Sequence, residues 1–176
     1  MKTYTIEEKN TIEEIIHECS SCSVGLIDKN GLPYVVPMSF GYQDGCIYMH
    51  SAPEGFLIDS LNRNPNVCIT FCTPSSLIWQ HPDVGCSYRL KAGSVICRGK
   101  VSFLEEEDFH GKKKILDILM SQYVQDKKFT YAVPALKNVK VWKVEVEDFS
   151  CKKFGVHHPN SKKYNPEVDD IDMFIK

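Results

Sequence analysis

The sequence predicts a mainly β protein with peripheral helices, arranged as an antiparallel barrel of about six short strands. Short apolar runs are separated by turn signals such as Asn30-Gly31 and Asp44-Gly45, which is typical of hairpins. The segment 139–147 alternates apolar and charged residues, as a half-buried strand does. The helical patterns between the strands are mostly short, so we expect helices around the barrel rather than inside it.

The first half of the chain is predicted to contain a helix and then hairpin-linked strands. Thr11 with Glu14 fits a capping box, so we expect the first helix to begin there. Its apolar positions would be Ile12, Ile15, Ile16 and Cys19. Strands are predicted over 24–28, 32–42, 46–50 and 67–72, with a short helix over 55–61. Pro33 and Pro37 cannot donate hydrogen bonds, so the second strand needs an edge, a bulge or a ligand beside it.

The second half is predicted to contain strands around one long helix. Residues 73–87 hold two prolines and a glycine and form an excursion, after which strands resume from about Tyr88, with a clearer run over 94–103. A helix is predicted over 105–123, followed by an irregular crossover over 124–138 and the strand over 139–147. We therefore expect one barrel domain over residues 1–153, including both helices, and a C-terminal tail over 154–176.

Charge and hydropathy exclude some classes of partner. The chain has 21 Lys and Arg against 23 Asp and Glu, whereas nucleic-acid binders carry a basic field. The basic run 112–114 follows the acidic run 105–108, which favours a solvated helix face. No apolar run approaches the ~18 residues of a membrane span, and the N-terminus lacks the apolar region of a secretory signal. We expect a cytoplasmic protein without nucleic-acid or membrane partners.

Eight cysteines need an explanation. Disulfides are disfavoured in a reducing compartment, so buried thiols are one interpretation. A zinc site is the alternative, because Cys19 and Cys22 have ligand spacing. No second such pair follows, and Cys68 and Cys72 on one strand would lie ~13 Å apart. We therefore expect thiols and no metal.

The segment from Gly31 to Val67 resembles a known family. The matching runs are Pro33-Tyr34-Val35-Val36-Pro37-Met38-Ser39-Phe40, Asp44 to Ala52, Gly55, Ile58-Asp59 and Asn64-Pro65-Asn66-Val67. A second signature is echoed by Ser94-Val95-Ile96-Cys97-Arg98-Gly99-Lys100. These runs are similar to the pyridoxamine 5'-phosphate oxidase-like, FMN-binding split-barrel superfamily, and most similar to its Nim (5-nitroimidazole resistance) branch.

The resemblance implies a six-stranded antiparallel split barrel that forms a homodimer, with FMN in two clefts between the subunits. Carried over by position, Pro37, Met38, Ser39 and Phe40 would run beside the isoalloxazine, largely through backbone contacts. His50, Ser51 and Ala52 would lie near the ribityl chain and phosphate, ahead of the loop glycine Gly55, and Ser94 and Val95 would also border the cofactor. His50 is the candidate catalytic residue; as an alternative it only caps the loop.

One position departs from the family pattern. Relatives usually place lysine just after the loop glycine, where it meets the flavin phosphate, but here Gly55 is followed by Phe56 and Leu57. A lost charge-assisted contact typically costs ~1.5–3 kcal/mol. Four other cations of the sequence are candidates to replace this lysine at the flavin phosphate: Arg63, Arg89, Lys91 and Arg98.

A second copy of the chain is also expected from the residues themselves. The predicted strand 32–42 is apolar on both faces: one face carries Leu32, Tyr34, Val36 and Met38, and Val35, Pro37 and Phe40 lie at or near the other. The excursion adds Leu77, Ile78 and Trp79, which a monomer would struggle to bury. The alternative is that the helix over 105–123 covers the strand within one chain.

Three functions remain open at this stage. The first is an FMN-dependent reductase of a small acceptor, such as a nitro-aromatic compound, in which the flavin supplies the chemistry. The second is a flavin or haem binder without turnover, with His50 or the pair His157-His158 as haem ligands. The third is a split barrel that has lost its ligand.

Overall fold

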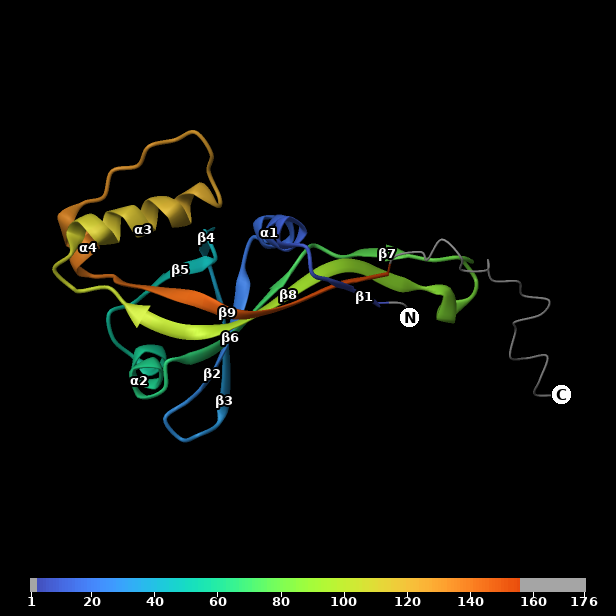
Figure 1. The fold of residues 1–176 in the computed structure, drawn as a ribbon, viewed down its shortest axis with the longest axis horizontal. Helices are drawn as coiled ribbons and strands as arrows, with labels where there is room; N and C mark the ends of the chain where they lie inside the picture. Colours follow the sequence, from blue (N-terminus) through green and yellow to red (C-terminus); the bar gives the residue numbers. More distant parts are fainter. Residues whose placement is uncertain (1–2, 156–176) are drawn as a thin grey trace.

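The computed structural model describes residues 3–155, which form a curled antiparallel sheet with helices around it (Figure 1). The strands are β1 (Thr3–Ile6), β2 (Cys22–Ile27), β3 (Pro33–Met38), β4 (Gly41–Gln43), β5 (Cys46–Ser51), β6 (Asn66–Cys72), β7 (Ser76–Ile78), β8 (Arg89–Phe103) and β9 (Lys140–Phe154). The helices are α1 (Lys9–His17), α2 (Phe56–Arg63), α3 (Phe109–Ser121) and α4 (Val133–Lys137), with a 3₁₀ turn over Gly85–Ser87. The predicted mainly β class is confirmed, with more strands than the six expected.

The sheet closes into a barrel between β3 and β4. The strand order is β3-β2-β6-β8-β9-β5-β4, so β3 and β4 lie at opposite ends of the order. Only Ser39 and Phe40 join these two strands in the chain. Met38 and Gly41 are three steps apart along the chain and therefore at most about 11 Å apart, so the two ends of the sheet must curl toward each other. The single strand predicted over 32–42 is therefore wrong: it is two strands, which part where Phe40 turns into the core with no exposed surface.

Of the two longest strands, β8 begins at Arg89, close to the predicted resumption at Tyr88, whereas β9 extends well beyond its predicted end at Glu147. β8 and β9 pair from Ala92–Phe154 to Phe103–Trp142, with a bulge beside Arg98 and Gly99. Any side chain at Gly99 would clash with the carbonyl oxygen of Glu145. Their far ends form an arm that also carries β1 and β7, at the side opposite α3 (Figure 1). The predicted excursion thus contains a short strand.

Alternating residues of the barrel strands form the core. On β9, Trp142 and Val144 are buried whereas Glu145 and Glu147 are exposed, which confirms the predicted alternation. The other strands contribute inward-facing residues in the same way: Val24, Leu26, Ile47, Met49, Val67, Ile69, Phe71, Val95 and Cys97. Because successive side chains of a strand point to opposite faces, the other residues of these strands face outward, toward solvent or a partner.

The helix starts differ from the prediction for local reasons. Glu8, not Thr11, is the residue before α1, and the Thr11 hydroxyl donates to the Glu8 carboxylate at 2.9 Å. The capping box is therefore wrong. α3 begins after Asp108, whose carboxylate accepts from the Gly111 N–H at 2.8 Å, so it starts four residues later than predicted. α3 packs mainly on β4 and β5.

The predicted tail begins within a strand, because β9 continues to Phe154. The rest of that segment, with His157 and His158, lies outside the described residues. Over residues 3–155, the helices are too short or too polar to cross a lipid bilayer.

Candidate functional site

The residues expected to contact a cofactor fall into two groups in one chain. The first, here the strand group, contains Pro37, Met38, Ser39, Phe40, Ser94 and Val95. Cross-strand pairing aligns Met38 with Cys22, Cys22 with Phe71, and Phe71 with Val95. Neighbouring strands lie about 4.8 Å apart, so Met38 and Val95 are about 14 Å apart across the sheet. Pro37 and Ser39 are exposed, whereas the side chains of Phe40 and Val95 are fully buried.

The second group, here the loop group, contains His50, Ser51, Ala52 and Gly55, where β5 ends and α2 begins. His50 pairs with Val141 on β9, whereas Val95 pairs with Cys151, ten positions further along that strand. At about 3.3 Å per residue, this separation is roughly 30 Å. A single chain therefore keeps Val95 far from His50, whereas Phe40 directly precedes Gly41, which pairs with Tyr48 on the strand of His50.

His50 is the titratable side chain of the loop group. Tyr48 pairs with Gly41, and a side chain at Gly41 would strike the backbone of α3, so this face of β5 looks toward α3. His50 lies two residues further along the same face and is half-buried. Its Nδ1 atom is buried without a hydrogen-bond partner among residues 3–155. Burial lowers the pKa of His50, so the imidazole is held neutral near pH 7.

The loop after His50 leaves room for a ligand. The Ser51 hydroxyl donates to the Ala52 carbonyl at 3.0 Å, and Gly55 has φ 118°, a conformation that favours glycine. No atom lies within 4 Å of a side chain built at Gly55. The first N–H groups of α2 have no acceptor within the helix, as at every helix start. An unpartnered imidazole nitrogen ahead of this open loop fits a polar cofactor.

The cations proposed from sequence to replace the missing lysine are mostly engaged elsewhere. The Arg63 guanidinium donates to the Lys29 carbonyl oxygen, and Arg98 forms an ion pair with Asp148 at 2.9 Å. Arg89 donates to Gln80 at 3.3 Å, and Lys91 lies on the arm opposite Ser76. None of these four contacts lies in the loop group.

Two lysines that the sequence reasoning missed lie closer to that loop. Lys140 pairs with Ser51 across β5 and β9, but its ammonium is bound to Glu106 at 2.8 Å. The ammonium of Lys29 lies 5.8 Å from the centre of the Phe56 ring. The one sequence signal for Lys29 is its place next to Asn30-Gly31, which predicts that Lys29 lies in a hairpin turn.

All eight cysteines are free thiols, and their environments differ. Cys19, Cys22, Cys97 and Cys151 are buried, whereas Cys72 and Cys86 are exposed. Burial raises the pKa of Cys19 to about 11 and those of Cys22 and Cys97 to about 12. Over residues 3–155, no three His, Cys, Asp or Glu side chains are grouped to hold a metal ion.

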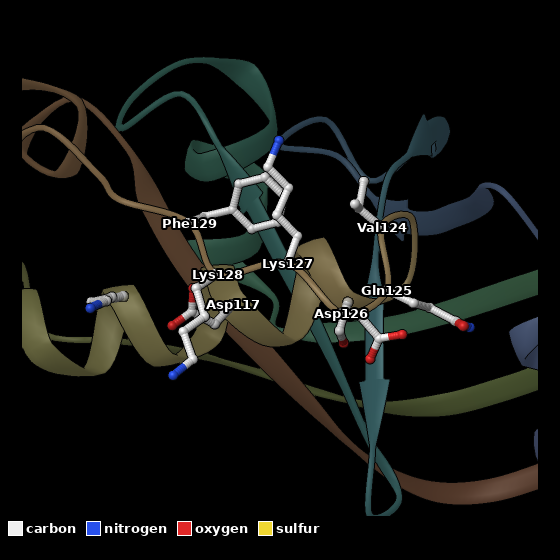
Figure 2. A pocket seen from close by; sticks show the side chains of 9 residues that line it. Asp117, Val124, Gln125, Asp126, Lys127, Lys128 and Phe129 are labelled. Carbon is white, nitrogen blue, oxygen red and sulfur yellow. The ribbon is translucent and has the colours of Figure 1, made fainter.

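A cavity of about 750 Å³ lies apart from both groups, between α3 and the loop that follows it. Figure 2 shows side chains that line it, among them Asp117 of α3 and Lys127, Lys128 and Phe129 of that loop. None of the residues expected to bind a cofactor lines it. A shallower apolar groove of about 330 Å³ lies on the outer surface of β2, β3 and β6, beside Val35 and Cys68.

Comparison with known proteins supports the resemblance found in the sequence. The family model of pyridoxamine 5'-phosphate oxidase matches residues 9–152. A candidate 5-nitroimidazole antibiotic resistance protein from Bacteroides thetaiotaomicron is 49% identical, with TM-score 0.77 over 86% of this chain and 87% of that chain. No curated protein matches the sequence.

More distant structures share the fold alone. The flavocytochrome Anf3 from Azotobacter vinelandii is 18% identical, with TM-score 0.72 over 90% of this chain and 72% of that chain. An FAD- and haem-binding protein from Mycobacterium smegmatis is 12% identical, with TM-score 0.74 over 92% and 77% of the two chains. Since the family match spans most of the sequence, the chain belongs to the pyridoxamine 5'-phosphate oxidase family, on the branch that resembles 5-nitroimidazole resistance proteins.

Proposed function

We propose that this protein binds FMN and uses it to reduce a small acceptor, with nitro-aromatic compounds as the substrate class. The proposal depends mainly on the Nδ1 atom of His50, which is buried and has no hydrogen-bond partner among residues 3–155. His50 lies near the end of β5, just ahead of the open loop at Gly55. The relative described as a candidate 5-nitroimidazole resistance protein supports the choice of acceptor. The cofactor and the acceptor are both open to direct test.

The residues of the chain have binding and positioning roles in this proposal. FMN, when bound, supplies the electron-transfer chemistry. His50 is neutral, so its imidazole can offer a hydrogen bond without adding a charge beside the ligand. Pro37 and Ser39 are exposed, so a flat ring can lie along this segment of the chain. The residues of the strand group therefore orient the cofactor rather than react with it.

A second copy of the chain completes the proposed site. Val95 of the strand group and His50 of the loop group are roughly 30 Å apart in one chain at about 3.3 Å per residue, so one cofactor meets both residues only if they come from two subunits. The outer surface near the apolar groove exposes Ile27, Leu32 and Val35, the last with 63% of its surface accessible. A twofold partner would cover this surface and generate two equivalent clefts.

Mutation of this surface tests the dimer without disturbing the core. Val36 packs against the core and Phe40 is fully buried, so charged residues there would unfold the chain. Val35→Glu places a charge on the exposed face instead. We expect light scattering to shift from about twice 20.1 kDa toward the monomer mass, with weaker FMN binding. A monomeric variant that binds FMN at full affinity would contradict a site shared between subunits.

The visible spectrum of the purified protein tests the cofactor. Flavin bands, and saturable quenching of added FMN at about one per subunit, are the expected result. A Soret band would favour the second candidate, haem binding, which the neutral and unpartnered imidazole of His50 also suits. No colour and no quenching at tens of micromolar FMN would contradict the proposed function.

A further inference from the structure

The loop group lacks the cation that the family resemblance places after the loop glycine, because Phe56 occupies that position. The structure brings a cation against the Phe56 ring from another element. Lys29, in the turn between β2 and β3, holds its ammonium 5.8 Å from the centre of the Phe56 ring. An ammonium at this distance from an aromatic face is attracted to it by a cation–π interaction.

The turn that carries Lys29 is held in place at several points. The Asp28 carboxylate accepts from the N–H groups of Asn30 and Leu32 at 2.7 and 2.9 Å, and Gly31 has φ 82°. The Arg63 guanidinium, at the other end of α2, donates to the Lys29 carbonyl oxygen. Lys29 is therefore tied to α2 through its backbone as well as its side chain.

Phe56 is itself oriented by the barrel. Its ring meets the ring of Tyr34 on β3 edge-on, with centres 5.0 Å apart and planes at 81°. An aromatic ring positions an ammonium without neutralising it, whereas a carboxylate would compete with a ligand anion. Among the ion pairs within residues 3–155, Lys140 is bound to Glu106 and Arg98 to Asp148, whereas Lys29 has no carboxylate partner. Lys29 is thus the cation left available near this loop.

We propose that Lys29 supplies the cation for the phosphate of the bound flavin, in place of the lysine missing after Gly55. This inference rests on the proposed function, since it concerns the same site. Phe56 and Arg63 act as positioning residues for Lys29. A charge-assisted contact of this kind would discriminate FMN, which carries a phosphate, from riboflavin, which does not.

Titration of both flavins against the full chain tests the inference. We expect Lys29→Ala to weaken FMN binding by about 10- to 100-fold and to leave riboflavin binding unchanged. Lys29→Arg should retain most of the FMN preference, and Phe56→Leu should lose part of it while keeping the charge. Lys100→Ala is the matched control, because exposed Lys100 pairs with Asn66 just beyond the opposite end of α2.

The outcomes separate this inference from the proposed function. An unchanged FMN affinity in Lys29→Ala, or an equal loss for FMN and riboflavin, would overturn the role of Lys29 while leaving flavin binding intact. An equal loss in Lys100→Ala would also overturn it, because the effect would then be general electrostatics. Wild-type protein that binds neither flavin would contradict the proposed function and the inference with it.

Discussion

Tyr123→Phe removes one oxygen atom from the point where the barrel closes. The Phe40 N–H donates to the Tyr123 hydroxyl oxygen at 2.9 Å, and Phe40 is one of the two residues that join β3 to β4. The side chain of Phe40 is fully buried, so this N–H has few alternative partners. The substitution keeps the aromatic ring and deletes only the acceptor.

The expected cost follows from the surroundings of this hydrogen bond. Leaving a buried N–H without an acceptor costs about 1–3 kcal/mol. Tyr123 is 40% exposed, so water can partly replace the lost oxygen. We therefore expect a loss of about 1 kcal/mol, at the lower end of that range. With a urea m-value of about 2 kcal/mol/M, the unfolding midpoint should fall by about 0.5 M.

Urea unfolding at fixed protein concentration measures this loss, since association would otherwise shift the midpoint. Tyr131→Phe is the control, because the Tyr131 hydroxyl donates to exposed Asp117 at 2.9 Å. We expect the control to change stability by less than about 0.5 kcal/mol. Equal losses in the two variants would refute the reasoning that burial of the Phe40 N–H sets the cost.

Three further predictions concern packing, thiols and pH. Gly41→Ala should lower the free energy of unfolding in urea by about 1–3 kcal/mol, because the new Cβ would lie 2.7 Å from the Leu119 Cα. Gly85→Ala is the control and should be near neutral, because a Cβ there meets no atom within 4 Å. A thiol reagent at pH 8 should modify the exposed Cys72 and Cys86 first and leave the four buried thiols unmodified. In denaturant all eight cysteines should react without prior reduction, and fewer than eight reactive thiols would indicate disulfides. Burial lowers the pKa of His50 in the folded state, so the unfolded chain binds more protons as pH falls below about 6.5 and stability declines there. His50→Gln should lose less stability than wild type between pH 7 and pH 5, and equal acid sensitivity would show that other groups dominate.

Local patterns were sufficient for much of the fold. The turn at Asn30-Gly31 depends on residues adjacent in the chain, and the structure has it between β2 and β3. The alternation over 139–147 depends on period two within one strand, and Trp142 and Val144 are buried as expected. The ordered motifs from Pro33 to Val67 were sufficient for the family, because they preserve spacing within one segment.

The sequence alone determined the strand-forming runs, the hairpin turns and the family, since each is written in short-range spacing. Only the tertiary structure decided that residues 32–42 form two strands at opposite ends of the sheet order, because that outcome depends on which distant strands pair. The same pairing set the roughly 30 Å between Val95 and His50, at about 3.3 Å per residue. The tertiary structure also brought Lys29 to Phe56, which lies 27 positions further along the sequence. No local pattern encodes this contact, because it depends on where α2 packs against the β2–β3 turn.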